Sequence, residues 1–259
     1  MKAYERVVKA RDGKRMSNLY FINKVITDFI EFHGDRRYAE DAAIVGGIGF
    51  LAGMPVTVIA MERGSDIQDR MRRNFGCPSP EGYRKALRLM KQAEKFNRPV
   101  ICLVSGSGAY CGVGAEERGQ GLAIAENLME MMTLKTPVVT VVTGEGGSGG
   151  ALALSVADNI FMLENAVYSV ISPEGCASIL WKDAAKASEA AEALKLTAAD
   201  LHEFGVIEKI IYEESKTNDD LCDDIKTELV SVLKALKKVP TDKLLEDRYN
   251  KFRKIGAIQ

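Results

Sequence analysis

Residues 144–150 contain glycine at a density that suits close contact between the backbone and a ligand. Five of these seven positions are glycine, and they lie between an apolar run that predicts a β-strand and the start of a predicted helix. Successive glycines at a helix N-terminus let backbone N–H groups approach an anion closely, which an oxyanion hole requires. A lone glycine is better explained by tight packing, but five in seven favour binding. We therefore expect stabilisation of negative charge by the backbone, without a reacting side chain.

The same segment also fits the dinucleotide-binding fingerprint. Gly144, Gly146 and Gly149 have the spacing G-x-G-x-x-G after a strand, and Glu164 follows twenty positions after the first glycine. This alternative predicts an NAD-binding oxidoreductase. Against it, the unit is internal, and a second glycine-rich segment at residues 105–114 precedes it, which one NAD site does not require.

A third interpretation makes Ser148 a nucleophile. Residues 146–150 read Gly-Gly-Ser-Gly-Gly and fit G-x-S-x-G, with Asp183 and His202 following in the order found in α/β hydrolases. His202, however, lies in a short predicted helix, residues 197–205, where exposure to solvent is the ordinary explanation. We regard the serine hydrolase as the less favoured alternative.

Basic residues also gather around residues 74–80. The members of this group are Arg70, Arg72, Arg73, Arg84, Lys85, Arg88 and Lys91. Together they could meet phosphates or a carboxylate, although a solvated helix face explains any one of them.

Composition excludes several classes of function. The 259 residues carry 35 Lys and Arg against 36 Asp and Glu, a net charge of -1, so no overall field attracts nucleic acid or an anionic membrane. No apolar run reaches the roughly 18 residues of a membrane span, and residues 1–14 lack the apolar core of a signal peptide, so we expect a cytoplasmic protein. Five cysteines without a CxxC pair and only two histidines indicate no metal site.

The elements that must position the glycine segments alternate between strand and helix. Apolar spacing predicts a helix over residues 16–32, strands at 43–51 and 55–61, and a helix at 80–96 that begins after Ser79. Two similar units follow.

The two units each consist of a strand, a glycine-rich loop and a helix. The strands are residues 100–104 and 138–142, and the second loop leads into a helix that opens at Ala151. Further strands are expected at 160–163 and 167–171. Continuous apolar strands alternating with helices indicate an α/β sheet covered on both faces.

The last part of the chain predicts helices and one strand. Residues 197–200 resemble a capping box, Gly205 ends that helix, and residues 206–211 form a strand. A final amphipathic helix ends at Pro240. We expect the charged tail, residues 241–259, to pack on a partner or to stay mobile.

Seven segments, taken in order, closely resemble the alpha subunits of bacterial acetyl-CoA carboxylase carboxyltransferases. They are residues 31–36, 43–47, 73–76, 80–90, 112–121, 144–153 and 168–182. The resemblance runs from about residue 4 to residue 211. It implies an α/β fold of the crotonase (ClpP/crotonase) type, a superhelix of repeated ββα units. It suggests one domain over residues 1–259, with a helical lead-in (1–40) and a C-terminal helix and tail (217–259).

The resemblance also implies a reaction and partners. Such a subunit transfers the carboxyl group of carboxybiotin, held on the biotin carboxyl carrier protein, to acetyl-CoA, giving malonyl-CoA for fatty-acid biosynthesis. It works in an ATP-dependent complex with biotin carboxylase and is active only with a carboxyltransferase beta subunit, usually as an α2β2 heterotetramer. The site lies between alpha and beta, and the freed biotin nitrogen can itself take the α-proton. No metal is expected in this chain.

The site residues implied by the resemblance are backbone groups. Gly146, Gly147, Gly149 and Gly150 would hold the ureido oxygen of biotin through their N–H groups, and the beta subunit would hold the thioester enolate. The substrate-binding residues would be Gly108, Ala109, Tyr110 and Ser148.

The chain departs from the family pattern in two places. Residues 105–112 read Ser-Gly-Ser-Gly-Ala-Tyr-Cys-Gly where the family usually has Asp-Thr-Pro-Gly-Ala-Tyr-Pro-Gly. A helical segment that many members carry before Tyr4 is also missing.

Overall fold

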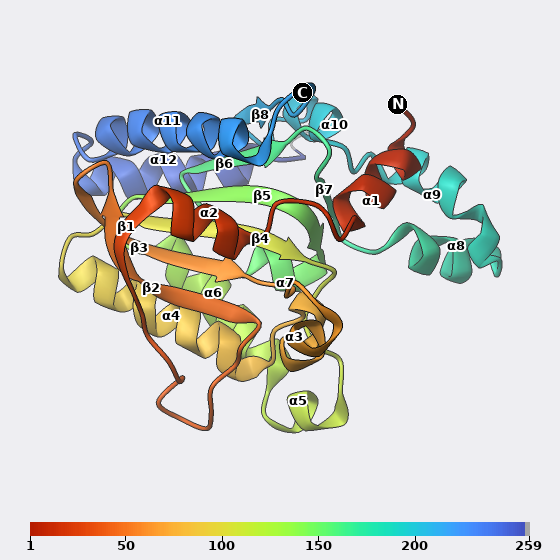
Figure 1. Cartoon of the computed structure of the whole chain (residues 1–259), viewed down its shortest axis with the longest axis horizontal. Helices are drawn as coiled ribbons and strands as arrows, with labels where there is room; N and C mark the ends of the chain where they lie inside the picture. Colours follow the sequence, from red (N-terminus) through yellow and green to blue (C-terminus); the bar gives the residue numbers. More distant parts are fainter. Residues whose placement is uncertain (257–259) are drawn as a thin grey trace.

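Apolar runs of the sequence form the strands of one eight-stranded sheet in the computed structural model, which describes residues 1–256 (Figure 1). The strands are β1 (Ile26–Glu31), β2 (Ile44–Leu51), β3 (Met54–Met61), β4 (Val100–Gly106), β5 (Val138–Gly147), β6 (Asn159–Leu163), β7 (Val167–Ser169) and β8 (Lys209–Ile211). Their order is β1-β2-β3-β4-β5-β6-β8, and β7 pairs with the end of β5. β1, β2 and β3 are antiparallel, whereas β3, β4, β5, β6 and β8 run parallel.

Helices cover the sheet on both faces. They are α1 (Ala3–Arg11), α2 (Asn18–Val25), α3 (Ile67–Arg72), α4 (Pro80–Lys95), α5 (Val113–Glu117), α6 (Gln120–Met132), α7 (Ser148–Leu152), α8 (Pro173–Trp181), α9 (Ala187–Leu194), α10 (Ala198–Glu203), α11 (Asn218–Leu236) and α12 (Thr241–Lys254), with 3-10 turns at Asn74–Gly76 and Ala184–Lys186. α4 and α6 pack together beside β2 and β3, while α2 contacts α11 (Figure 1). This agrees with the α/β arrangement expected from the alternating pattern. No helix among residues 1–256 is long and apolar enough to cross a membrane.

The predicted helix over residues 16–32 is wrong beyond Val25. There α2 ends, and the chain passes directly into the edge strand β1. Three of the six residues of β1 are β-branched, a class that favours strands, and its apolar spacing fits a short strand as well as a helix. Gly47 of β2 lets this strand approach, because a Cβ there would lie 2.2 Å from the backbone oxygen of Ile30. The lead-in expected for residues 1–40 is therefore only partly helical.

The prediction of a glycine-rich loop directly after residue 142 is also partly wrong. β5 continues through Gly147, and α7 starts at Ser148 rather than at Ala151. Every residue of β5 is buried. The end of β5 pairs with β7, and Gly146 lies opposite Tyr168 in this pairing. The glycines are thus part of the sheet, which fixes their backbone direction.

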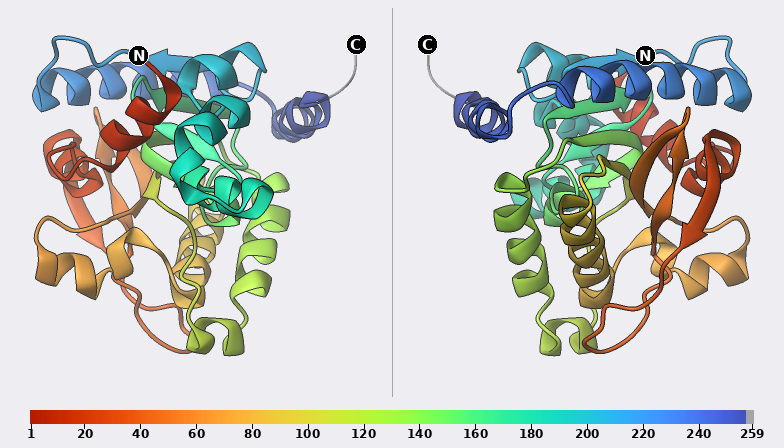
Figure 2. Two further views of the ribbon diagram at one scale, coloured as in Figure 1. Left: turned by 90° about the vertical axis from the view of Figure 1, so that its right-hand side faces the viewer. Right: turned by 90° about the vertical axis from the view of Figure 1, so that its left-hand side faces the viewer.

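The charged tail packs on its own chain through residue 254. Residues 241–254 form α12, seen end-on in Figure 2, and residues 257–259 of that tail lie outside the described residues. Arg248 anchors the helix and is 1% exposed. Its guanidinium donates to both carboxylate oxygens of Asp158, at 2.8 and 2.9 Å, and to three backbone carbonyls that follow α6 or lie at its end. A buried charge with all its donors satisfied explains why a polar sequence docks here.

The capping box predicted at residues 197–200 is confirmed, because Thr197 and Asp200 form it at the start of α10. At the start of α8, the side chain of Ser172 is the cap. α4 begins at Pro80 as expected, but the side chain of Ser79 makes no cap, and the Ser79 N–H instead donates to Asp41. The strand predicted at 206–211 is confined to β8, because the N–H groups of residues 206 and 207 still bond to the end of α10.

We predict that Arg248→Ala lowers the free energy of unfolding by about 3–5 kcal/mol, because the carboxylate of Asp158 would remain buried without its partner. Urea denaturation of the full chain measures this. Arg253→Ala, an exposed position of the same helix, is the matched control and should change stability by less than about 0.5 kcal/mol. A loss below about 1 kcal/mol for Arg248→Ala would contradict the anchoring role.

Candidate functional site

The two glycine segments meet in one open cleft of about 790 Å³. Residues Gly108 and Ala109 line one side of it, and Ser148, Gly149 and Gly150 line the other. The three other residues predicted for the site do not line the cleft: Gly146, Gly147 and Tyr110. The first two lie behind it in β5, and Tyr110 is held by its backbone, which donates to Pro78 and accepts from Gln120.

The sheet itself brings the segments together. β4 and β5 are parallel neighbours, with Val104 beside Val142 and Gly106 beside Gly146. Their carboxyl ends therefore lie at the same edge, where ligands bind in open α/β sheets. Each strand then leads directly into one wall of the cleft.

Glycine is required where the two backbones touch. A Cβ on Gly147 would lie 1.9 Å from the backbone oxygen of Ser107, and a Cβ on Gly150 would lie 2.5 Å from the backbone nitrogen of Ala109. Real Cβ atoms do not approach backbone atoms so closely, so any side chain here would force the walls apart. Gly149 differs, because its nearest neighbour would be a side-chain carbon of Ile124 at 3.5 Å, an ordinary contact.

The cleft offers backbone N–H groups as donors. The first residues of a helix have no acceptor within the helix, and no side chain caps α7, which begins Ser148-Gly149-Gly150. Within residues 1–256, the N–H groups of Gly108 and Ala109 also make no hydrogen bond to a protein acceptor. Residues with available N–H donors from two chain segments thus line one space, and donors from both sides of a cleft are what an oxyanion hole requires.

Ser148 occupies the left-handed region of backbone space, with φ of 55°. This conformation costs a non-glycine residue about 1–2 kcal/mol. Ser148 stands where β5 ends and α7 begins, and Gly149 and Gly150, which follow it, line the cleft.

A charged network that the sequence analysis missed lies at the side of the cleft. Arg11 of α1 binds both oxygens of Glu145, at 2.7 and 3.1 Å, and also Glu174 at 2.8 Å, which in turn accepts from the hydroxyl of Tyr4 at 3.0 Å. Burial alone would raise the pKa of Glu174, but hydrogen bonds from Arg11 and Tyr4 hold it below its usual range. Burial alone would lower the pKa of Arg11, whereas its bonds to Glu145 and Glu174 raise it.

These ion pairs occupy the carboxylates that line the cleft. Because both carboxylates accept from Arg11, neither is a free base toward a ligand. Glu145 could have been found from its place among the glycines, and Glu174 from its place after Ser172. Nothing in the spacing of α1 indicated Arg11.

Residues 105–112 lack the two prolines of the family pattern and instead make a polar side-chain contact. Ser107 and Cys111 stand where the family pattern has proline, and the hydroxyl of Ser107 lies 3.3 Å from the sulfur of Cys77. Burial raises the pKa of the Cys77 thiol, which disfavours its thiolate, the reactive form.

The dinucleotide alternative does not fit this geometry. Gly144 and Gly146 lie within β5, whereas the fingerprint needs its first glycine in the tight turn after the strand. The carboxylate of Glu164 faces Arg6 at 3.6 Å and accepts the N–H of Glu213 at 3.1 Å, so it is engaged within the protein.

The hydrolase alternative lacks its base. Neither His33 nor His202, the two histidines of the chain, lines the cleft that contains Ser148. His202 is exposed on α10, and Asp183 is exposed and caps a 3-10 turn. The structure does not bring the three residues into one site.

Comparisons with known proteins agree on one family. The family described as acetyl co-enzyme A carboxylase carboxyltransferase-like matches residues 1–256. The alpha subunit of acetyl-coenzyme A carboxylase carboxyl transferase from Streptococcus pyogenes serotype M5 (strain Manfredo) is 56% identical over 250 residues, covering 96% of this chain and 98% of that protein. The alpha subunit from Ruminiclostridium cellulolyticum is 54% identical over 258 residues, covering 100% and 99%.

A solved structure agrees on the fold. Transcarboxylase 12S with methylmalonyl-coenzyme A and methylmalonic acid bound superposes with a TM-score of 0.73 at 21% identity, over 89% of this chain and 43% of that chain. At this identity the likeness concerns the fold alone.

We predict that Gly147→Ala lowers the free energy of unfolding by about 1–3 kcal/mol, because its Cβ meets a backbone oxygen that cannot move aside. Gly149→Ala, two positions away, is the matched control, and it should leave stability unchanged or raise it by up to about 1 kcal/mol. Thermal or urea unfolding of both variants distinguishes them. Equal stability of the two would show that the walls of the cleft are not in backbone contact.

Proposed function

Because the chain belongs to the family of acetyl-CoA carboxylase carboxyltransferase alpha subunits, we propose that its two glycine segments bind the biotin-borne carboxyl donor of that enzyme. The activity follows from the family: the chain is the carboxyltransferase alpha subunit of a biotin-dependent acetyl-CoA carboxylase. The expected crotonase-type fold is confirmed by the likeness to transcarboxylase 12S. Which residues act, and on which group, is our proposal.

The proposal rests on one observation: Gly108, Ala109, Gly149 and Gly150 line a single cleft, and their backbone N–H groups are available as donors. Biotin supplies a ureido group that carries the carboxyl and whose oxygen gains negative charge when the carboxyl leaves. Fixed N–H dipoles facing that oxygen stabilise the developing charge without moving, which gives typically about 2.7–4 kcal/mol for one donor. The cleft can stabilise an anion but contains no free base. This fits biotin, because the nitrogen that loses the carboxyl group can itself accept the α-proton of the acyl-CoA.

The roles of the other residues follow from their positions. Gly147 lets the two backbones approach at Ser107, Gly146 leaves room for the side chain of Tyr168 in β7, and Ser148 supplies the turn. Arg11 and Glu145 hold α1 against the end of β5, which fixes the direction of this wall. Tyr110 does not line the cleft, and its role is to hold the neighbouring Ala109 in place through its own backbone hydrogen bonds.

An apolar groove of about 430 Å³ adjoins the cleft and shares Ser148, Gly149 and Val170 with it. Leu152 and Phe252 are among its other lining residues. We assign it to the apolar ring and chain of the arriving biotin, because these parts leave water while the ureido group meets the polar donors.

The partners complete the site. The acceptor, acetyl-CoA, needs an oxyanion hole of its own for the thioester enolate, and we assign that second hole to the carboxyltransferase beta subunit in an α2β2 assembly. The biotin carboxyl carrier protein and biotin carboxylase supply the loaded donor. The product of the reaction assigned in this way is malonyl-CoA for fatty-acid biosynthesis.

The experiment that tests the proposal is reconstitution. The purified chain alone should form no malonyl-CoA from acetyl-CoA and carboxylated carrier, and addition of the beta subunit should restore formation by at least about a hundredfold, because one of two oxyanion holes is then supplied. A radiolabelled carboxyl group measures the product. Formation by the chain alone at the rate of the complete enzyme would refute the split site.

We further predict that Ser148→Ala and Ser148→Gly keep turnover of the reconstituted enzyme within about threefold, since the proposed chemistry uses backbone groups only. Glycine also relieves the left-handed strain and should raise stability by about 1 kcal/mol. Turnover and labelling by a fluorophosphonate are measured together. Loss of turnover accompanied by covalent labelling of Ser148 in the unmodified chain would restore the hydrolase.

A further inference from the structure

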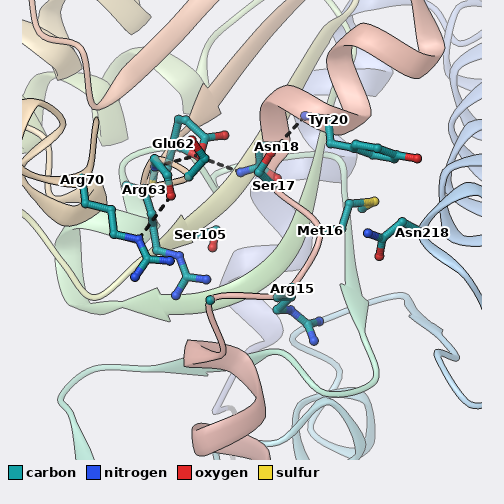
Figure 3. A pocket seen from close by; sticks show the side chains of 14 residues that line it. Arg15, Met16, Ser17, Asn18, Tyr20, Glu62, Arg63, Arg70, Ser105 and Asn218 are labelled. Carbon is teal, nitrogen blue, oxygen red and sulfur yellow. Dashed lines mark hydrogen bonds between the residues drawn. The ribbon is translucent and has the colours of Figure 1, made fainter. Parts of the chain in front are cut away.

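A second, smaller cavity of about 230 Å³ has a lining that shares no residue with the cleft; Figure 3 shows its side chains. Its walls come from the connection between α1 and α2, the segment after β3, α3 and Ser105 at the end of β4. None of these walls belongs to the donors of the cleft. The lining is polar and holds three arginines: Arg15, Arg63 and Arg70.

Two of the three guanidinium groups are free to bind an anion. Figure 3 shows those of Arg63 and Arg70 side by side. Among residues 1–256 neither forms an ion pair, whereas Arg72 on the same helix as Arg70 binds Asp69 at 2.6 Å. Arg15 is different, because Glu213 lies 2.9 Å from it.

Most donors of these two side chains have no protein acceptor. Arg63 reaches only the carbonyls of Ala10 and Asp12, and Arg70 only that of Gly64, all three at 3.4 Å, near the limit for a hydrogen bond. A guanidinium carries five N–H donors, so most remain for a ligand.

The one carboxylate that lines the cavity is engaged elsewhere. Glu62 is 2% exposed, and its two oxygens accept the N–H groups of Leu19 and Gly64, each at 2.9 Å. Burial is the main cause that lowers the pKa of Arg63; the charge of Glu145 opposes this shift, as does that of Glu62, while the positive charges of Arg15 and Arg70 add to it. Arg63 and Arg70 repel each other, and because neither forms an ion pair among residues 1–256, an anion bound between them would remove that cost.

From this arrangement we propose that Arg63 and Arg70 form a binding site for a phosphate-class anion, a phosphoryl or diphosphoryl group. Two guanidinium groups from different segments suit several oxygens arranged tetrahedrally, and Ser65 and Ser105 add hydroxyl groups at the wall. The cavity is smaller than the roughly 300 Å³ of a typical small-molecule pocket. It therefore takes a free small anion or only the phosphate end of a larger molecule.

Two sources share this chemistry, the phosphates of an acyl-CoA and a free phosphate or diphosphate. Ser105 is two residues from Ser107 of the cleft, and Gly13 of this cavity is two residues from Arg11, so the two spaces are neighbours. The inference does not depend on the donor site proposed above, because the residues and the measurement are different.

Calorimetric titration of the full chain with inorganic pyrophosphate at low ionic strength tests the site. We expect saturable binding, a Kd raised about tenfold by Arg63→Gln or by Arg70→Gln, and about a hundredfold by the double variant, since each removes charge-assisted hydrogen bonds. Arg72→Gln is the matched control on α3 and should change the Kd less than about twofold. Absence of binding, or equal Kd values for the double variant and the unmodified chain, would overturn the proposal.

Two further measurements complete the test. Pyrophosphate should raise the melting temperature of the unmodified chain and of Arg72→Gln but not of the double variant, whose melting temperature without ligand reports its folding. Malonate binding as tight as pyrophosphate would overturn the assignment to the phosphate class. If coenzyme A displaces pyrophosphate, the site binds the phosphates of an acyl-CoA. If coenzyme A leaves pyrophosphate binding unchanged, the site binds a free phosphate or diphosphate.

Discussion

Direct contact between two stretches of backbone, residues 107–109 and 147–150, constrains the rest of the molecule. No side chain fits between them at Gly147 or Gly150. Residues of both stretches, Gly108 and Ala109 from one and residues 148–150 from the other, therefore line the same cleft. The contact can exist only where two parallel strands end side by side, which β4 and β5 provide. The buried position of β5, its pairing with β7 and the Arg11–Glu145 ion pair all hold the second stretch in place.

This arrangement accounts for a carboxyltransferase subunit without an obvious catalytic side chain. The carboxylates of the cleft are bound by Arg11, and no histidine of the chain lines it. What remains toward a ligand is a set of fixed dipoles, which are effective where charge develops and water is excluded. A site of this kind stabilises an anion but does not itself move a proton, which is why the proposed chemistry depends on a donor that accepts its own proton and on a second subunit.

The sequence allowed every strand except β1, most helices and the glycine segments to be predicted, because apolar period and glycine density are local signals. It also indicated the family from seven ordered segments. It could not place β1, since a short β-branched run is compatible with both helix and strand until an edge of the sheet is available. It missed the docking of α12, which depends on one arginine, Arg248, meeting an aspartate 90 residues earlier. The pairs of Arg11 with Glu145 and Glu174 are likewise long-range and leave no periodic trace.

We propose that backbone N–H groups of this chain hold the ureido oxygen of biotin, and a structure of the chain assembled with its beta subunit and biotin would show whether they do. We expect the ureido oxygen within about 3.2 Å of a backbone nitrogen of Gly108 or Ala109 and of one of Gly149 or Gly150. A ureido oxygen bound only by side chains, or lying outside this cleft, would contradict it.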